Sequence, residues 1–177
     1  MFDVVMPNNN EEEFIDVGLA LGYSEICFLV QDMDYGYKND KIIIKRACLI
    51  KSAADMSKAK KRFDYIFADA SRSAFESNID YIINAEDYPG RDSFHYRKTA
   101  FNQVHAKLAR ENSIKIVFSF AKLIDADLRG KQRILGRMMQ NALVARKYKV
   151  AIASFTLTKD PERMRSRVIL DAFLHIL

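Results

Sequence analysis

The chain has 177 residues, of which 49% are hydrophobic, and it carries a net charge of +5. This length and apolar content predict one domain, spanning residues 1–177, with a sizeable core. No run reaches the roughly 20 apolar residues that a membrane span needs. The first residues also lack the basic-then-apolar order of a signal peptide, so we expect a soluble, cytoplasmic protein with no membrane partner.

Seven short runs rich in β-branched and aromatic residues recur along the chain, and helix-like segments separate most of them. This alternation is typical of βαβ units around a parallel sheet. The predicted strands are Phe2–Met6, Glu25–Val30, Ile42–Ile50, Asp64–Asp69, Ile79–Ile83, Ile114–Phe120 and Val150–Phe155. They predict an α/β fold, a compact and incomplete TIM-like (β/α) barrel with about seven strands, and the alternative is a doubly wound open sheet.

Capping residues and apolar periodicity predict the helices. Their expected ranges are 11–21, 57–63, 71–77, 96–112, 129–149 and 163–177. The segment Val30–Lys41 is polar and predicts a loop, or a hairpin between neighbouring strands. Cys27 and Cys48 lie in apolar strand runs, where we expect them to pack in the core rather than form a disulfide or bind metal.

Charge is divided unevenly between the two halves of the chain. Residues 1–90 hold 10 Lys/Arg and 16 Asp/Glu, whereas residues 91–177 hold 18 and 7. Between Asp127 and Asp160 there is no acidic residue, although eight lysines and arginines lie there. A solvated helix usually mixes both signs, so this region favours a surface that faces a polyanion.

Basic and aromatic residues follow the fifth predicted strand, where Phe94, His95 and Tyr96 stand among arginines and a lysine. Such a mixture suits contacts to phosphate and stacking on an unpaired base, although packing would also explain the aromatic residues. In a (β/α) barrel the loops after the strands gather at one face. The predicted RNA-binding residues are Arg91, Arg97, Lys98, Lys122, Arg129, Arg133, Lys159 and Arg165.

Motifs for protein-borne catalysis are scarce. The sequence has no glycine-rich phosphate loop, no Gly-x-Ser-x-Gly and no Cys-x-x-Cys, and its three histidines lack the spacing of metal ligands. Carboxylates do follow several strands, as at Asp32, Asp34, Asp69, Glu86 and Asp87. They leave open a metal-dependent phosphoesterase, although turns and helix caps give the same pattern.

One stretch resembles a known family. Residues 97–109 (RKTAFNQVHAKLA) are similar to a segment of ribonuclease P protein component 3, the thirty-kilodalton ribonuclease P subunit family. Further similarities follow in register at Ile114–Ile124, Arg137–Met139, Arg146–Val150, Ala153–Ser154 and Met164–Ser166. The resemblance covers about residues 88–177. This chain departs from the family at Thr99, Asn102–Gln103 and Ala121, and the glycine of the family motif has no clear counterpart in it.

The resemblance implies a subunit of an RNA-based endoribonuclease. Such a subunit binds ribonuclease P RNA and precursor tRNA, pairs with ribonuclease P protein component 2 in a heterotetramer, and supports the Mg²⁺-dependent endonucleolytic removal of the 5′ leader. The Mg²⁺ would belong to the RNA, so we expect no cofactor on the protein and no protein-borne active site. The alternatives are a stand-alone phosphoesterase of the histidinol-phosphatase-type barrel, which needs His-x-His where this chain has Met6–Asn8, and a protein whose basic face meets an acidic partner.

Overall fold

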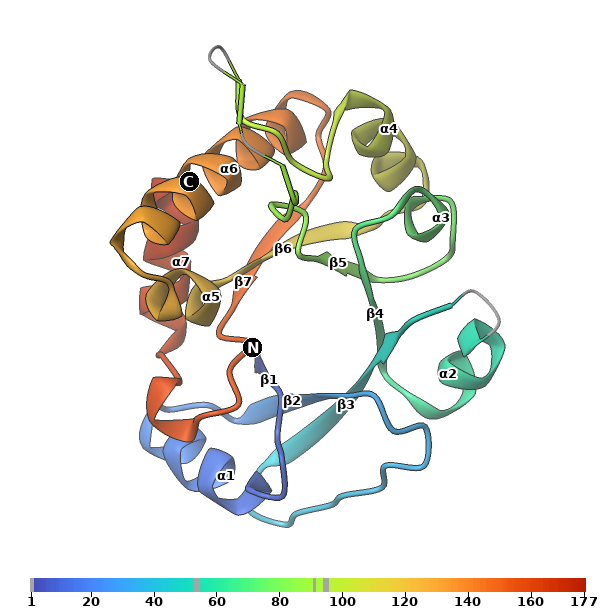
Figure 1. Cartoon of the computed structure of the whole chain (residues 1–177). Coiled ribbons are helices and arrows are strands. Elements are labelled where there is room, and N and C mark those ends of the chain that lie inside the picture. The colour runs from blue at the N-terminus through green and yellow to red at the C-terminus, as the bar shows by residue number, and fades with distance from the viewer. Residues whose placement is uncertain (1, 53–54, 91, 94–95) are drawn as a thin grey trace.

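Seven parallel strands form one sheet in the order β1-β2-β3-β4-β5-β6-β7 (Figure 1). This computed structural model describes residues 2–52, 55–90, 92–93 and 96–177. Every predicted strand is present, and neighbours in the sequence are neighbours in the sheet. The strands are β1 (Phe2–Val5), β2 (Glu25–Val30), β3 (Ile43–Ile50), β4 (Tyr65–Asp69), β5 (Tyr81–Ile83), β6 (Lys115–Ser119) and β7 (Ile152–Phe155).

The first and last strands meet through the segment that follows β7. Leu157 donates its backbone N–H to the Val4 carbonyl at 2.8 Å, and Met6 donates to the Thr158 carbonyl at 2.8 Å. The sheet is therefore nearly closed, with helices between the strands. This confirms the TIM-like barrel and excludes the doubly wound open sheet.

A buried carboxylate adds further hydrogen bonds between β1 and the segment after β7. Asp3 accepts a hydrogen bond from the Thr156 backbone N–H at 2.8 Å, and it also accepts one from the Thr156 hydroxyl. Burial raises the pKa of Asp3 to about 6, although the bonds from Thr156 and the charge of Arg167 oppose the rise. Side-chain hydrogen bonds thus replace part of the backbone ladder between β1 and β7.

Helices cover the outside of the strands (Figure 1). They are α1 (Glu11–Ala20), α2 (Met56–Arg62), α3 (Arg72–Phe75), α4 (Gln103–Glu111), α5 (Phe120–Asp125), α6 (Leu128–Lys147), a 3₁₀ turn η2 (Pro161–Arg163) and α7 (Arg167–Ile176). The helix predicted from residue 96 begins only at Gln103, because Asn102 caps it by accepting from the N–H groups of Val104 and His105.

The loop predicted between β2 and β3 is present, whereas the alternative of a hairpin is wrong, because these strands pair in parallel. The chain instead returns along the outside of the barrel as a long loop without a helix (Figure 1). Tyr35 and Tyr37 of this loop pack against Phe28, with ring centroids 6.5 and 5.9 Å apart. The loop therefore covers buried apolar surface where a helix normally would.

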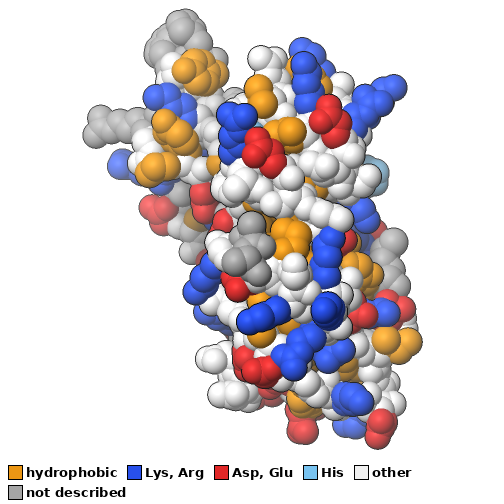
Figure 2. All heavy atoms as spheres, turned by 90° about the vertical axis from the view of Figure 1, so that its right-hand side faces the viewer, with side chains coloured by type: hydrophobic (Ala, Val, Ile, Leu, Met, Phe, Trp, Pro, Cys, Tyr) orange, Lys and Arg blue, Asp and Glu red, His pale blue; other side chains and the backbone are white. Residues whose placement is uncertain are grey.

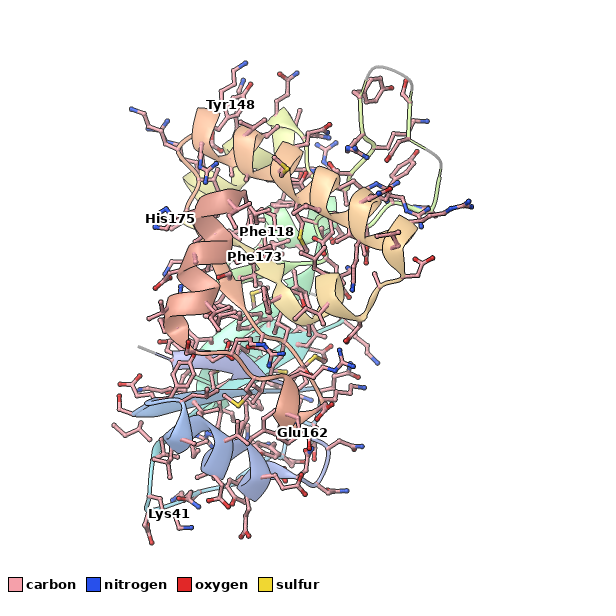
Figure 3. All side chains as sticks on the ribbon, turned by 90° about the vertical axis from the view of Figure 1, so that its left-hand side faces the viewer. Lys41, Phe118, Tyr148, Glu162, Phe173 and His175 are labelled. Carbon is pink, nitrogen blue, oxygen red and sulfur yellow. The ribbon has the colours of Figure 1, made fainter. Side chains whose placement is uncertain are left out.

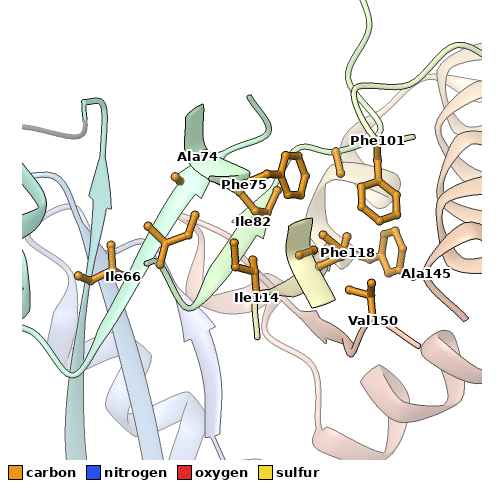
Figure 4. Close-up of a cluster of buried hydrophobic side chains, with 14 of the residues drawn as sticks. Ile66, Ala74, Phe75, Ile82, Phe101, Ile114, Phe118, Ala145 and Val150 are labelled. Atoms are coloured by element: carbon orange, nitrogen blue, oxygen red, sulfur yellow. The ribbon is translucent and has the colours of Figure 1, made fainter. Parts of the chain in front are cut away.

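Successive strand residues point alternately to the inside and the outside of the barrel, and each side has its own apolar cluster. Inside the barrel, Val4, Cys27, Phe67 and Val117 are fully buried. Outside it, strand side chains pack against the helices in the larger cluster of Figure 4. Both Cys27 and Cys48 are buried and free, which confirms their packing role. None of the helices that the structure describes is long and apolar enough to cross a bilayer.

Candidate nucleic-acid interface

The carboxyl ends of β4, β5 and β6 surround a hollow of about 400 Å³ at one end of the barrel. Ligand sites of (β/α) barrels are found at this end. Polar groups converge there because Asp69 ends β4, Asn84 follows β5 and Ser119 ends β6. The polar side chains that line the hollow are Asp69, Asn84, Asp87, Ser119, Lys122 and Asp125.

Lys122 is held inside this group of acceptors. Its Nζ lies 2.7 Å from Asn84 Oδ1, 3.0 Å from Glu86 Oε1 and 2.7 Å from Asp87 Oδ1. Asn84 in turn donates to Asp69 Oδ1 at 2.7 Å. Lys122 therefore acts here as an internal counter-ion, and its ammonium is already engaged by oxygens that would compete with a phosphate.

Glu86 is the buried member of this network, with 1% of its surface exposed. Burial raises the pKa of Glu86 above its ordinary value, and the Lys122 ammonium opposes this rise. No donor among the described residues meets either of its oxygens in hydrogen-bond geometry, so the ion pair with Lys122 is its main compensation. Loss of that ammonium would leave a buried charge unpaired.

Two residues that line the hollow adopt left-handed backbone conformations. Asn84 has φ 58° and Leu157 has φ 52°. Asparagine tolerates the left-handed region, whereas leucine rarely adopts it, so the backbone of Leu157 is strained. Strained backbone conformations are frequent at functional sites. Among the residues that the structure describes, no group of three or more His, Cys, Asp or Glu could hold a metal ion.

A buried arginine holds three residues that follow β5. Arg137 of α6 is 5% exposed and donates to Asp92 Oδ1 from Nε at 3.0 Å and from Nη2 at 2.8 Å. It also donates to the carbonyls of Tyr88 at 3.2 Å and Gly90 at 3.1 Å. Hydrogen bonds from Arg137 and from Lys98 N–H hold the pKa of Asp92 below its ordinary value, against the effect of burial. Arg137 is thus a structural clamp.

The clamped loop sets Arg97 against α6. A Cβ at Gly136 would collide with the Arg97 guanidinium, so glycine is what allows this close approach. Gln140 reinforces the contact by donating to the Arg97 carbonyl at 2.7 Å. Arg133 lies one turn before Gly136 and Arg129 one turn earlier still, and both are exposed. The structure therefore brings Arg97, Arg129 and Arg133 together along the first half of α6.

Of the other predicted RNA contacts, Lys98 follows Arg97 directly in the chain, whereas Lys159 and Arg165 lie near η2. Lys98 places its Nζ 5.7 Å from the centre of the Tyr88 ring. Lys159 is exposed beside η2, and Arg165 donates to the carbonyls of Glu162 at 3.1 Å and Met164 at 2.7 Å, which braces the same turn. Arg91, Phe94 and His95 lie outside the described residues.

Sequence reasoning predicted the helix at residues 57–63 but passed over its positive charge, which lies in the acidic half of the chain. Four of the seven residues of α2 are lysine or arginine, namely Lys58, Lys60, Lys61 and Arg62, and all four are exposed. Charge totals over each half of the chain do not show these four residues, because the first half is acidic overall. A charge count over a short sequence window would have shown them. Asn84 was also missed, because one asparagine after a strand resembles an ordinary turn residue.

Apolar side chains are exposed on the opposite side of the barrel, where α6 and α7 lie (Figures 1 and 3). Met139 and Leu143 of α6 are 41% and 64% exposed, and Val168 and Ile176 of α7 are 78% and 68% exposed. Arg146 ties the two helices together by donating to the Leu174 carbonyl at 3.3 Å. Exposed apolar groups on adjacent helices favour contact with another protein.

The fold is similar to that of a chain in the cryo-EM structure of archaeal ribonuclease P with mature tRNA. The TM-score is 0.76 at 19% identity, and the match covers 100% of this chain and 82% of that one. A crystal structure of an uncharacterized protein matches with a TM-score of 0.54 at 7% identity, over 98% of this chain and 70% of that one. No family model and no curated protein matches the sequence. These likenesses establish the barrel fold over the length of the chain.

Proposed function

We propose that this chain is a protein subunit of ribonuclease P that binds the catalytic RNA. The observation that carries the proposal is the fold match to a chain of archaeal ribonuclease P over all of this chain. The sequence resemblance in residues 97–109 supports it independently, because that comparison rests on motifs rather than on shape.

In this proposal the first half of α6 and the adjoining loop form the main RNA contact. Arg129 and Arg133 present exposed guanidinium groups suited to phosphate. Arg97, which also pairs with Asp92 at 3.5 Å, lies against the same helix, and Lys98 follows it in the chain. Lys159 and Arg165 extend the contact at η2, and Arg91 belongs to the same proposed set. Lys122 acts indirectly, by fixing the loop that carries Glu86 and Asp87. Phosphate contacts of this kind position the RNA without reading its sequence.

The partner in this proposal is ribonuclease P protein component 2, in a heterotetramer with two copies of each protein. The exposed apolar residues of α6 and α7 are the proposed contact. Catalytic Mg²⁺ would be held by the RNA of the assembled enzyme in the cytoplasm. The protein would contribute binding and positioning rather than a protein-borne active site.

Reconstitution tests this function directly. Cleavage of precursor tRNA is measured with the catalytic RNA and component 2, with and without this chain, across a Mg²⁺ series. We expect the chain to lower the Mg²⁺ concentration needed for removal of the 5′ leader. An unchanged Mg²⁺ requirement would reject the proposal.

The second candidate is a metal-dependent phosphoesterase that uses the hollow at the barrel mouth. The convergence of Asp69, Asp87 and Asp125 on that hollow favours it. The position of Lys122 disfavours it, because its ammonium occupies the space between three of the available oxygens. Phosphatase assays with Mg²⁺, Mn²⁺ and Zn²⁺ separate the candidates, since turnover that Asp69→Asn abolishes would support the hydrolase.

A further inference from the structure

A compact block of positive charge lies in the half of the chain that is acidic overall. Residues 45–62 hold seven lysines and arginines and one acidic residue, Asp55. The seven are Lys45, Arg46, Lys51, Lys58, Lys60, Lys61 and Arg62. Figure 2 shows lysine and arginine side chains gathered over α2, which faces the viewer. The α2 part of the block is therefore exposed at the surface, whereas Lys45 and Arg46 of β3 are half-buried.

The lysines of α2 are free to meet a partner. Ala59 is the buried residue of the helix, whereas Lys58, Lys60 and Lys61 are exposed and form no ion pair with any described residue. Arg62 differs, because it pairs with Asp34 and donates to the Met33 carbonyl at 2.9 Å. Basic residues do stabilise the last turn of a helix. That effect does not explain the positive charge that precedes this turn.

A pocket of about 250 Å³ adjoins this surface, between the ends of β3 and β4 and the helix α3. Its walls combine apolar side chains, such as Ile50, with the hydroxyls of Ser73 and Ser77 and the carboxylate of Asp69. Lys51, from the basic block, also lines it. The pocket is smaller than the about 300–1,000 Å³ that hold drug-sized ligands, which suits one planar base with apolar faces and polar edges.

We propose that α2 and this pocket bind a single-stranded segment of RNA. Lys58, Lys60 and Lys61 contact consecutive phosphates, Lys51 bridges the helix and the pocket, and the pocket receives one unpaired base. A base in a duplex is stacked and paired and cannot enter, so the surface selects single strands. The choice of RNA as the polyanion rests on the proposed function. The surface formed by α2 and the pocket is separate from the α6 contact described above.

The position of this surface allows it to act together with a protein partner. In Figure 1, α2 lies on the opposite side of the barrel from α6 and α7. A protein that covers the apolar residues of α6 and α7 therefore leaves α2 open. The barrel can then hold RNA on a side that the protein partner does not occupy.

The first test measures the binding of the full chain to a fluorescent uridine dodecamer over a KCl series. The variant Lys58→Ala/Lys60→Ala/Lys61→Ala is compared with a control, Lys38→Ala/Lys107→Ala/Lys147→Ala, that removes the same charge elsewhere. If three phosphates of a single strand are no longer neutralised, the salt slope of log K should fall by about 2 units. We expect the control to change the slope by less than half of that.

The second test concerns the pocket. Ser73→Phe should fill it, whereas Asn78→Phe places the same ring on an exposed residue that does not line it. The wild-type chain should prefer the uridine dodecamer over an abasic dodecamer by about tenfold, the magnitude expected for one held base. Ser73→Phe should remove most of this preference, and Asn78→Phe should keep it.

The outcomes separate this inference from the proposed function. A wild-type chain that binds no RNA would reject both. RNA binding and stimulated cleavage, with equal slopes for the α2 variant and its control, would reject the α2 surface and leave the proposed function standing. A retained base preference in Ser73→Phe would reject the pocket. If the α2 variant no longer binds phosphatidylserine vesicles but keeps its RNA affinity, the surface is a lipid contact and the RNA assignment is overturned.

Discussion

Arg137 of α6 donates two hydrogen bonds to Asp92, a residue 45 positions earlier in the chain. The same guanidinium also donates to the carbonyls of Tyr88 and Gly90, and Asp92 in turn accepts from the Lys98 N–H, next to Arg97. The proposed RNA contact therefore depends on a buried residue that touches no RNA itself.

Replacing Arg137 by lysine should loosen the loop after β5. Lysine keeps the charge but cannot donate in the planar, forked arrangement that Asp92 and the carbonyls accept. We expect a loss of roughly 2 kcal/mol in the free energy of unfolding, and faster tryptic cleavage after Arg97 and Lys98. Urea denaturation and limited proteolysis measure the two effects. The exposed Arg133→Lys is the control, and equal cleavage rates in both variants would contradict the clamp.

Asp3 should make the stability of the barrel depend on pH. Its folded-state pKa is raised from 3.8 to about 6, so its contribution to stability is fully present below 3.8 and is lost as the pH rises through 6. The shift corresponds to roughly 3 kcal/mol. Asp3→Asn keeps the shape and removes the titration. The difference in unfolding free energy between wild type and Asp3→Asn should therefore fall between pH 4 and pH 7, and a constant difference would contradict this account.

Lys122 and Glu86 should behave as a coupled pair. Lys122→Met leaves the buried Glu86 carboxylate without its ammonium, which should destabilise the protein by roughly 3 kcal/mol at neutral pH. Acidification should recover part of this loss, because protonation removes the unpaired charge from a group whose pKa is already raised. The double variant Lys122→Met/Glu86→Gln should be more stable than Lys122→Met alone. Additive effects in a thermal unfolding cycle would show that the two side chains are independent.

The first half of α6 should contribute salt-dependent affinity for RNA. Replacing Arg97 and Arg133 by alanine should weaken binding and reduce the salt slope by about one unit for each phosphate that is no longer neutralised. Filter binding over a KCl series measures this, and circular dichroism checks that the fold persists. The control is Lys107→Ala/Lys147→Ala. An unchanged slope in the arginine variant would remove α6 from the RNA surface.

The exposed apolar residues should govern association with other proteins. Leu143→Glu places a charge on the α6 surface, where 64% of the leucine is exposed, so the fold should tolerate it. We expect this variant to lose pairing with component 2 and to self-associate less in sedimentation experiments. Val104→Glu makes the same change on α4, which packs against α6 but contributes no residue to the proposed contact. Equal pairing of both variants would contradict the proposed interface.

The sequence by itself predicted the seven strands and their α/β alternation, because apolar runs and helical periodicity are local properties. It left a barrel and an open sheet as alternatives, and the hydrogen bond from Leu157 to the Val4 carbonyl decided between them. It also identified the excess of basic residues in the second half. Only the tertiary structure showed that Lys122 is a counter-ion rather than a free cation, since its acceptors Asn84, Glu86 and Asp87 come from a different strand connection. The same holds for Arg137, whose partner Asp92 is distant in sequence. Charge can be counted along a chain, but whether a charge is exposed to RNA or already paired depends on contacts between residues far apart in it.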